Sequence, residues 1–292
     1  MAWTFEKIAG PFAGPTGGLA WDGSGMLFSA LDEGRILRYA PQTGDVGVFR
    51  RYTNRTNGLA FDAHGALYGC QELSRRVVRF NEDGSISATG QLIDGRYHNQ
   101  PTSLAIDSRS QIWFSDPWSE RRAAGPQLFP PLEHASVLRL ELDVLRKLWN
   151  VRRMTYDTAA PRALALSADE ATLYVAETDN RPQGRRELRA YPVLSDGTLG
   201  AYTLLHSFGH DHRGEHRGIE GLCFDRHGNI VAVAGWRRAG PGPLVYVFAP
   251  SGAVIESHPF PADAPMSCAF GGEDRGSLYV TTAGGELWRT KR

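Results

Sequence analysis

The residues Asn57-Gly58-Leu59-Ala60-Phe61 decide the fold, because the chain carries six versions of this short phrase. Each version has a variable first residue, which we call the head residue, then a small residue and an apolar run. The versions occupy residues 17–21, 57–61, 102–106, 162–166, 220–224 and 266–270. A repeat of roughly 40 to 60 residues that is built from short strands is typical of β-propeller blades. The sequence therefore predicts an all-β, six-bladed propeller with four antiparallel strands in each blade.

Bulk composition bounds the protein class. A blade cannot bury its faces without its neighbours, so all 292 residues are expected to form one domain, 1–292. Lys plus Arg and Asp plus Glu both number 32. This balance gives no field that would gather nucleic acid or an anionic membrane. No apolar run approaches the roughly 20 residues of a membrane helix, and the first residues lack a secretion-signal pattern. Three cysteines, two of them inside the phrase, suit core positions in a reduced, cytoplasmic protein.

The first blade sets the template for the others. Its predicted strands cover residues 18–21, 26–30, 35–39 and 47–52, and they are rich in β-branched and aromatic residues. In four blades the phrase is followed by Asp, which begins a tight turn; these residues are Asp22, Asp62, Asp107 and Asp225. The sixth blade is one strand short. The unassigned strand from Trp3 to Ala9 is predicted to complete that blade and so to close the ring without an open edge.

The long connections are predicted to share one face. They cover residues 117–135, 179–186, 206–219 and 236–243, and each follows a second strand or precedes a first strand. In an up-and-down blade these positions lie at the end where the first strands begin. Long structured loops on one face of a rigid scaffold usually carry function. We therefore expect the working mouth of the channel at this end.

The six head residues are predicted to converge on the channel mouth. They are Gly17, Asn57, Thr102, Arg162, Glu220 and Met266. Glu220 suits a general base or a metal ligand; alternatively, it forms a structural ion pair with Arg162. The Arg162 guanidinium suits a carboxylate, a phosphate or an enolate. Asn57 either caps its turn or offers its amide oxygen to a cation.

Histidines and hydroxyls add further candidates. His216 precedes Glu220 by four residues and is a candidate catalytic base. His98 lies just before Thr102 and is a candidate substrate contact. The other candidate substrate contacts are Asn57, Thr102 and Ser103. For the histidines of residues 206–216 the alternative is a solvated polar loop, because their spacing fits no standard zinc motif. The chain has no nucleophile elbow and no phosphate-cradling glycine loop. We therefore expect no nucleotide and no organic cofactor.

Several runs of sequence resemble the SMP-30/gluconolactonase family. They are residues 57–62, 112–117, 172–177, 187–192, 216–221, 242–248 and 269–282, so the resemblance extends over essentially the whole chain. It implies a six-bladed propeller with one divalent cation, usually calcium, zinc or magnesium, at the channel mouth. It also implies hydrolysis of sugar lactones, with phosphotriester hydrolysis in some relatives.

The resemblance also implies where that cation would be held. The family's first-blade Glu falls on Gly17, its third-blade Asn on Thr102, its fourth-blade Asn on Arg162 and its fifth-blade Asp on Glu220. Only Glu220 keeps a carboxylate, whereas a hard cation takes about six oxygen ligands. Two mechanisms follow. Either a cation held by Glu220 polarises the lactone carbonyl, or Arg162 stabilises the oxyanion while Glu220 or His216 acts as the base.

Three functions compete at this stage. The leading prediction is a hydrolase that opens a lactone or a related cyclic ester. A metal-independent lyase or isomerase acting on a carboxylate-bearing small molecule would use the same groups, and a non-catalytic binding propeller is the third possibility. In each case the expected partner is a small molecule with an anionic or carbonyl group, and neither nucleic acid nor a membrane is expected.

Overall fold

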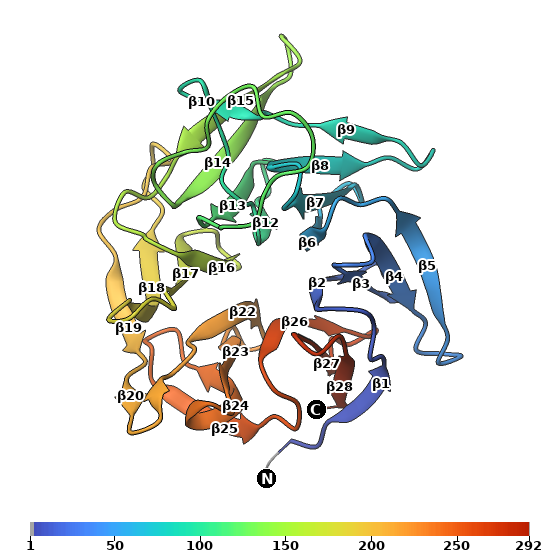
Figure 1. Ribbon diagram of the computed structural model, residues 1–292, viewed down its shortest axis with the longest axis vertical. Coiled ribbons are helices and arrows are strands. Elements are labelled where there is room, and N and C mark those ends of the chain that lie inside the picture. The colour runs from blue at the N-terminus through green and yellow to red at the C-terminus, as the bar shows by residue number, and fades with distance from the viewer. Residues whose placement is uncertain (1–2, 292) are drawn as a thin grey trace.

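A computed structural model describes residues 3–291, so the first two residues and the last residue of the predicted domain lie outside it. Within that range the chain forms strands and no helix. Six four-stranded antiparallel sheets surround a central channel (Figure 1). The predicted all-β, six-bladed propeller is confirmed. None of the described segments is a helix long and apolar enough to cross a membrane.

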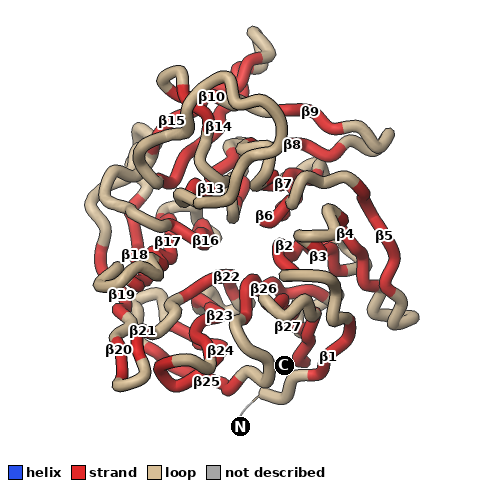
Figure 2. The backbone as a smooth tube through the Cα atoms, in the orientation of Figure 1, coloured by secondary structure: helices blue, strands red, loops and turns tan. Residues whose placement is uncertain are grey.

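The strands of each blade follow one another from the channel outward (Figures 1 and 2). The first blade contains β2 (Thr16–Trp21), β3 (Met26–Ala30), β4 (Arg35–Tyr39) and β5 (Val46–Arg51). The second contains β6 (Thr56–Phe61), β7 (Leu67–Gln71), β8 (Arg76–Phe80) and β9 (Ile86–Ala88). The third contains β12 (Leu104–Ile106), β13 (Ile112–Asp116), β14 (Ser136–Asp143) and β15 (Leu148–Arg153). The fourth blade contains β16 (Pro161–Leu166), β17 (Thr172–Thr178), β18 (Arg186–Pro192) and β19 (Thr203–Ser207). The fifth contains β22 (Ile219–Phe224), β23 (Ile230–Trp236), β24 (Ala239–Phe248) and β25 (Val254–Pro259). Two short hairpins, β10 (Leu92–Ile93) with β11 (Arg96–Tyr97) and β20 (His210–Asp211) with β21 (Gly214–Glu215), lie outside the blades.

The sixth blade joins the two ends of the chain. It contains β26 (Pro265–Gly271), β27 (Ser277–Thr282) and β28 (Leu287–Lys291), and β1 (Glu6–Ala9) pairs with β28 as its outer strand. The predicted closure of the ring is therefore confirmed, although the strand begins at Glu6 rather than Trp3. The Trp3 ring instead stacks on His258 with the ring centroids 4.1 Å apart.

The buried apolar side chains form six clusters, and each cluster lies between two neighbouring blades. The core is thus a ring of inter-blade contacts, and no blade buries its faces alone. This arrangement explains why strands of apolar residues recur around the whole chain.

One of the predicted loops is a strand extension. Residues 236–243 were expected to be irregular, but β23 continues to Trp236 and β24 begins at Ala239, which pairs with it. The segment was expected to be a loop because it follows the second strand of its blade, whereas the short hairpin β20–β21 supplies partners for the strand extension. The Trp236 indole N–H donates to the Glu215 carbonyl at 3.0 Å, and the Gly240 N–H donates to Asp211 Oδ2 at 3.0 Å.

The head residues coincide with irregularities in the innermost strands. The pairing register shifts between Gly17 and Leu19 in β2 and between Thr56 and Leu59 in β6. The same shift occurs in β16, β22 and β26, where it skips the head residue itself. A β-bulge takes a residue out of the ladder and re-aims its side chain. The bulges therefore allow Asn57, Arg162, Glu220 and Met266 to face the channel, whereas Thr102 lies just before β12 and Gly17 stays paired with Ser29.

The small residue after each head is required by the close approach of adjacent inner strands. A Cβ added to Gly58 would lie 2.7 Å from the Thr102 carbonyl oxygen and 2.9 Å from Ser103 Cα, both in the third blade. A Cβ on Gly221 would lie 2.7 Å from Ser267 Cα in the sixth blade. Contacts this short do not occur between unstrained atoms. Glycine at this position of the phrase therefore indicates that the backbones of two neighbouring blades are in direct contact.

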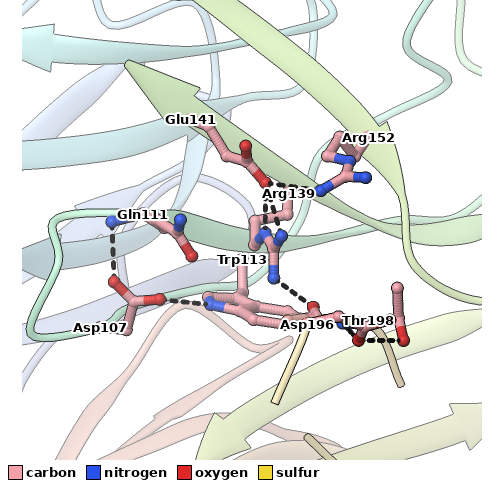
Figure 3. Close-up of polar contacts among 9 residues, drawn as sticks. Asp107, Gln111, Trp113, Arg139, Glu141, Arg152, Asp196 and Thr198 are labelled. Atoms are coloured by element: carbon pink, nitrogen blue, oxygen red, sulfur yellow. Dashed lines mark hydrogen bonds and ion pairs between the residues drawn. The ribbon is translucent and has the colours of Figure 1, made fainter. Parts of the chain in front are cut away.

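The Asp that follows the phrase fixes the first turn of a blade. Asp107 Oδ1 accepts hydrogen bonds from the N–H groups of Arg109 and Gln111, at 3.0 and 2.8 Å, which is an Asx-type turn. Its Oδ2 accepts the indole N–H of the buried Trp113 at 3.0 Å (Figure 3). The Arg139 guanidinium lies 4.6 Å from the ring centroid of Trp113. One turn residue thus orients the largest buried side chain of its blade.

We predict that Gly58→Ala destabilises the ring. The added methyl group must displace the backbone of the third blade, and such overpacking lowers the free energy of unfolding by about 1–3 kcal/mol. Gly47→Ala is the matched control, because no atom lies within 4 Å of the added Cβ and the glycine is in an outer strand. Urea unfolding of both variants checks the prediction, and equal stability of the two would contradict it.

Candidate active site

A cavity of about 220 Å³ lies at the channel mouth, at the end where the inner strands begin. Its polar lining residues come from the second to the sixth blades and from the loop after β13. They are Arg55, Asn57, Glu72, Gln100, Thr102, Ser103, Ser119, Arg121, Arg162, Glu220 and Ser267. The head residues Asn57, Thr102, Arg162, Glu220 and Met266 are therefore brought together, as is Ser103.

Glu220 presents one occupied and one unoccupied carboxylate oxygen. Its Oε1 accepts a hydrogen bond from Arg217 Nε at 3.0 Å. Its Oε2 has no hydrogen-bond partner among residues 3–291. The structural partner of Glu220 is therefore Arg217, three residues earlier, and not Arg162 as the alternative interpretation of the sequence held.

Arg162 is a cation without a matching acid. No carboxylate among the described residues lies within 4.0 Å of its guanidinium, and its buried Nε–H has no partner. The residue is only partly exposed, and it contributes to both the cavity and a neighbouring groove. Since a guanidinium carries five N–H donors, these donors are available to an oxygen atom of a ligand.

Glu72 organises a second polar cluster that sequence reasoning missed. It accepts hydrogen bonds from Arg55 Nε at 2.7 Å, Asn57 Nδ2 at 2.8 Å and Gln100 Nε2 at 3.2 Å. Arg55 also pairs with Asp32. Both oxygens of Glu72 are thus occupied, and the cluster fixes the Asn57 side chain. Its position in the sequence could have indicated it, because Glu72 directly follows β7, the second strand of its blade, which ends at the channel mouth.

Thr102 and Ser103 line the cavity but already have protein partners. The Thr102 hydroxyl donates to the Gln100 carbonyl at 2.8 Å. The Ser103 hydroxyl accepts the Leu164 N–H at 3.4 Å, which links the third blade to the fourth. Their predicted contact with substrate remains a prediction.

His216 and His98 do not line the cavity. The His216 ring stacks on Phe208 with centroids 4.6 Å apart, and its Nδ1 accepts the Gly218 N–H at 2.9 Å. Burial lowers its pKa to about 4. The fully buried His98 packs against Phe114, and neither of its ring nitrogens has a hydrogen-bond partner in the part of the chain that the structure describes. Burial lowers its pKa to about 3. The structure therefore places both rings in the core around the mouth.

Two buried acids tether the segments that lead into the inner strands. Asp116, at the end of β13, accepts the N–H groups of Asn99 and Gln100 at 2.7 and 2.8 Å. Burial raises its pKa to about 7. Glu177 in β17 accepts the N–H groups of residues 159 and 160, both at 2.7 Å, and burial raises its pKa. These carboxyls hold backbone and do not line the cavity.

Residues 16–284 match the family described as the SMP-30/Gluconolactonase/LRE-like region. The chain belongs to this family. It is 28% identical over 266 residues to a 6-deoxy-6-sulfogluconolactonase of Pseudomonas putida, covering 88% of this chain and 79% of that protein. It is 26% identical over 263 residues to a pentonolactonase of Haloferax volcanii, covering 88% of this chain and 76% of the relative. The solved structure of a gluconolactonase from Xanthomonas campestris superposes with a TM-score of 0.80 at 28% identity, covering 99% of this chain and 89% of that chain.

The donor groups of this chain do not fit the family's divalent cation. Gly17 offers no side chain, and the Asn57 carboxamide occupies the space next to its Cα. Arg162 brings a positive charge to a ligand position, and Glu220 is already bonded to Arg217. Among residues 3–291 no three His, Cys, Asp or Glu side chains are grouped to hold a metal ion. A hard cation needs several oxygens with carboxylate charge, which these positions do not supply.

We predict that His98 makes the protein acid-sensitive. Its pKa is about 3 in the folded state and near 6.5 when unfolded, so the unfolded state binds more protons as the pH falls below 6.5. At pH 4.5 this difference removes roughly 2–3 kcal/mol of the stability present at neutral pH. In His98→Phe, lowering the pH from neutral to 4.5 should reduce the free energy of unfolding by less than in the wild type, because this histidine no longer takes up a proton on unfolding.

Chemical denaturation at pH 7.5 and 4.5 measures this effect. His64→Phe serves as the control, because His64 is exposed on a turn. Parallel pH profiles for the wild type and His98→Phe would refute the assignment. His216 titrates in the same direction in all three proteins, so it cancels from the comparison.

Proposed function

We propose that this protein is a lactone hydrolase that opens sugar lactones or related cyclic esters in the cavity at the channel mouth. The observation that carries the proposal is the juxtaposition of Glu220 and Arg162 on the inner strands β22 and β16, which contact each other. Glu220 supplies a carboxylate oxygen that has no hydrogen-bond partner among residues 3–291, and Arg162 supplies a guanidinium that forms no ion pair with a carboxylate of these residues. Membership of the family and the lactonase names of the relatives support the same activity.

The two groups divide the chemistry between them. Glu220 Oε2 accepts a proton from a water molecule as the water oxygen forms a bond to the lactone carbonyl carbon. The carbonyl π electrons move to the carbonyl oxygen, and the Arg162 guanidinium stabilises that oxyanion. When the oxyanion re-forms the carbonyl, the ring C–O bond breaks, and the departing alkoxide takes the proton from Glu220. The product is the hydroxy acid, and Glu220 returns to its carboxylate form.

Charge at the mouth favours an oxygen that is or becomes negative. Arg55 is paired with Glu72 and Asp32, and Arg217 is paired with Glu220, whereas Arg162 and Arg121 at the cavity have no acid partner among residues 3–291. Counting these groups together, four arginines face three acids, which leaves one positive charge in excess. This excess suits the oxyanion and the released carboxylate. It also suits a lactone with an anionic substituent, which is the kind of substrate named for the Pseudomonas putida relative.

We further propose that these protein groups, and not a cation in the family position, stabilise the oxyanion. The support is the donor set: a guanidinium stands where a neutral ligand is expected, and the remaining carboxylates already have arginine partners. Two of the three cysteines, Cys70 and Cys268, are buried in the core, which suits the cytoplasmic setting that we propose for the chain.

Substituting either group should abolish turnover without unfolding the protein. We expect Glu220→Gln to lower kcat for a sugar lactone by about 10²–10⁴-fold through loss of the base. Arg162→Ala should lower it by about 10²–10³-fold through loss of oxyanion stabilisation. Turnover corrected for spontaneous hydrolysis and the melting temperature are measured on the same samples, with the exposed-site variants Glu273→Gln and Arg51→Ala as controls. A destabilised but fully active Arg162→Ala protein would end the catalytic assignment of that residue.

Removal of divalent ions should leave the activity intact. Because Arg162 supplies the positive charge, dialysis against EDTA is expected to change kcat/KM by less than twofold. Adding calcium, zinc or magnesium should not shift the melting temperature. Loss of activity on chelation that one of these ions restores would contradict the proposed mechanism, although not the lactonase activity.

A further inference from the structure

A groove of about 730 Å³ adjoins the cavity on the side of the third and fourth blades. It lies between the loop that connects β13 to β14, the segment that leads into β16 and the turn after β17. Arg162 and Ser119 line both spaces, so the groove meets the cavity at the proposed oxyanion group. Its volume is several times that of the cavity. A ligand that reacts at Arg162 therefore has room to extend outward along this groove.

The groove is lined by one exposed aromatic ring and several small side chains. Trp118 has 58% of its surface exposed, and the other tryptophans of the described chain are buried or only partly exposed. Ala135, Ala159 and Ala160 also line the groove. An exposed indole in a groove with small side chains offers a face on which a flat, partly apolar group can stack.

The remaining lining is rich in hydrogen-bond acceptors and carries no free positive charge beyond Arg162. Asp179 is bonded to Arg181 at 2.7 Å, so this pair is neutral. Glu133 is largely exposed although it bonds Arg96, and Glu120 forms no ion pair within residues 3–291. Carboxylates accept hydrogen bonds from hydroxyl groups and repel anions. The groove is therefore suited to an uncharged ligand with several hydroxyls.

A pyranose ring has both properties, since its C–H faces are apolar and its edge carries hydroxyl donors. Building on the lactonase activity proposed above, we propose that the groove is a second sugar subsite. The lactone ring of the substrate reacts in the cavity, and a second, uncharged sugar ring stacks on Trp118 within reach of Asn180 and Glu120. The preferred substrate class is thus the lactone of an oxidised disaccharide.

The test compares kcat/KM for the lactones of lactobionic acid and gluconic acid. In the wild type we expect the disaccharide lactone to be favoured by at least tenfold, mainly through a lower KM. In Trp118→Ala the ratio of the two kcat/KM values should fall to about one. Tyr52→Ala is the matched control, because it removes an aromatic ring that is 91% exposed and lies outside both the cavity and the groove. Its ratio should equal that of the wild type.

Two results would overturn the subsite. One is a wild-type ratio near one; the other is a high ratio that survives in Trp118→Ala. A preference for alkyl-chain lactones over the disaccharide lactone would likewise exclude a sugar as the occupant. If neither sugar lactone is hydrolysed, the proposed function fails instead, and calorimetric titration with lactobionate and gluconate then decides the subsite. Tenfold tighter binding of lactobionate that Trp118→Ala removes would support the subsite, and equal affinities would refute it.

Discussion

Six inner strands must converge on one axis, and this crowding governs both the fold and the site. At the second position of the phrase the backbones of neighbouring blades touch, so Gly58 and Gly221 have no space for a Cβ. Immediately before that contact the ladder bulges, and the head residue leaves the sheet. The same irregularity therefore closes the ring and directs a set of side chains to one mouth.

This arrangement separates the chemistry of the mouth from the stability of the propeller. The apolar clusters lie between blades, whereas the head residues contribute little to them. A head residue can change from a carboxylate to glycine or arginine without altering a core contact. This independence explains how a chain with the family's fold can carry Gly17 and Arg162 at positions where the family resemblance implies metal ligands. It also explains why fold alone does not assign a mechanism.

The repeat made the blade order, the closure by β1 and the position of the head residues predictable from sequence. It did not reveal Arg55, Glu72 and Arg217, because these residues lie in the connections that enter or leave the inner strands, where no period fixes the direction of a side chain. His216 was misplaced for the same reason. Four residues from Glu220 in sequence, its ring turns toward Phe208, since burying an aromatic face there is favourable and the Gly218 N–H needs an acceptor.

Hydrogen bonding at the mouth leaves no room for a carboxylate side chain at position 17 while Asn57 keeps its place. A carboxylate side chain at position 17 would need the space that the Asn57 carboxamide occupies. Moving Asn57 away would remove its hydrogen bond to Glu72 and leave a buried carboxylate with fewer donors beside Arg55. A substitution at Gly17 or at Arg162 alone therefore does not restore a cation site. The Glu72 cluster therefore helps to keep Gly17 free of a carboxylate side chain, in addition to the charge that Arg162 brings to the mouth.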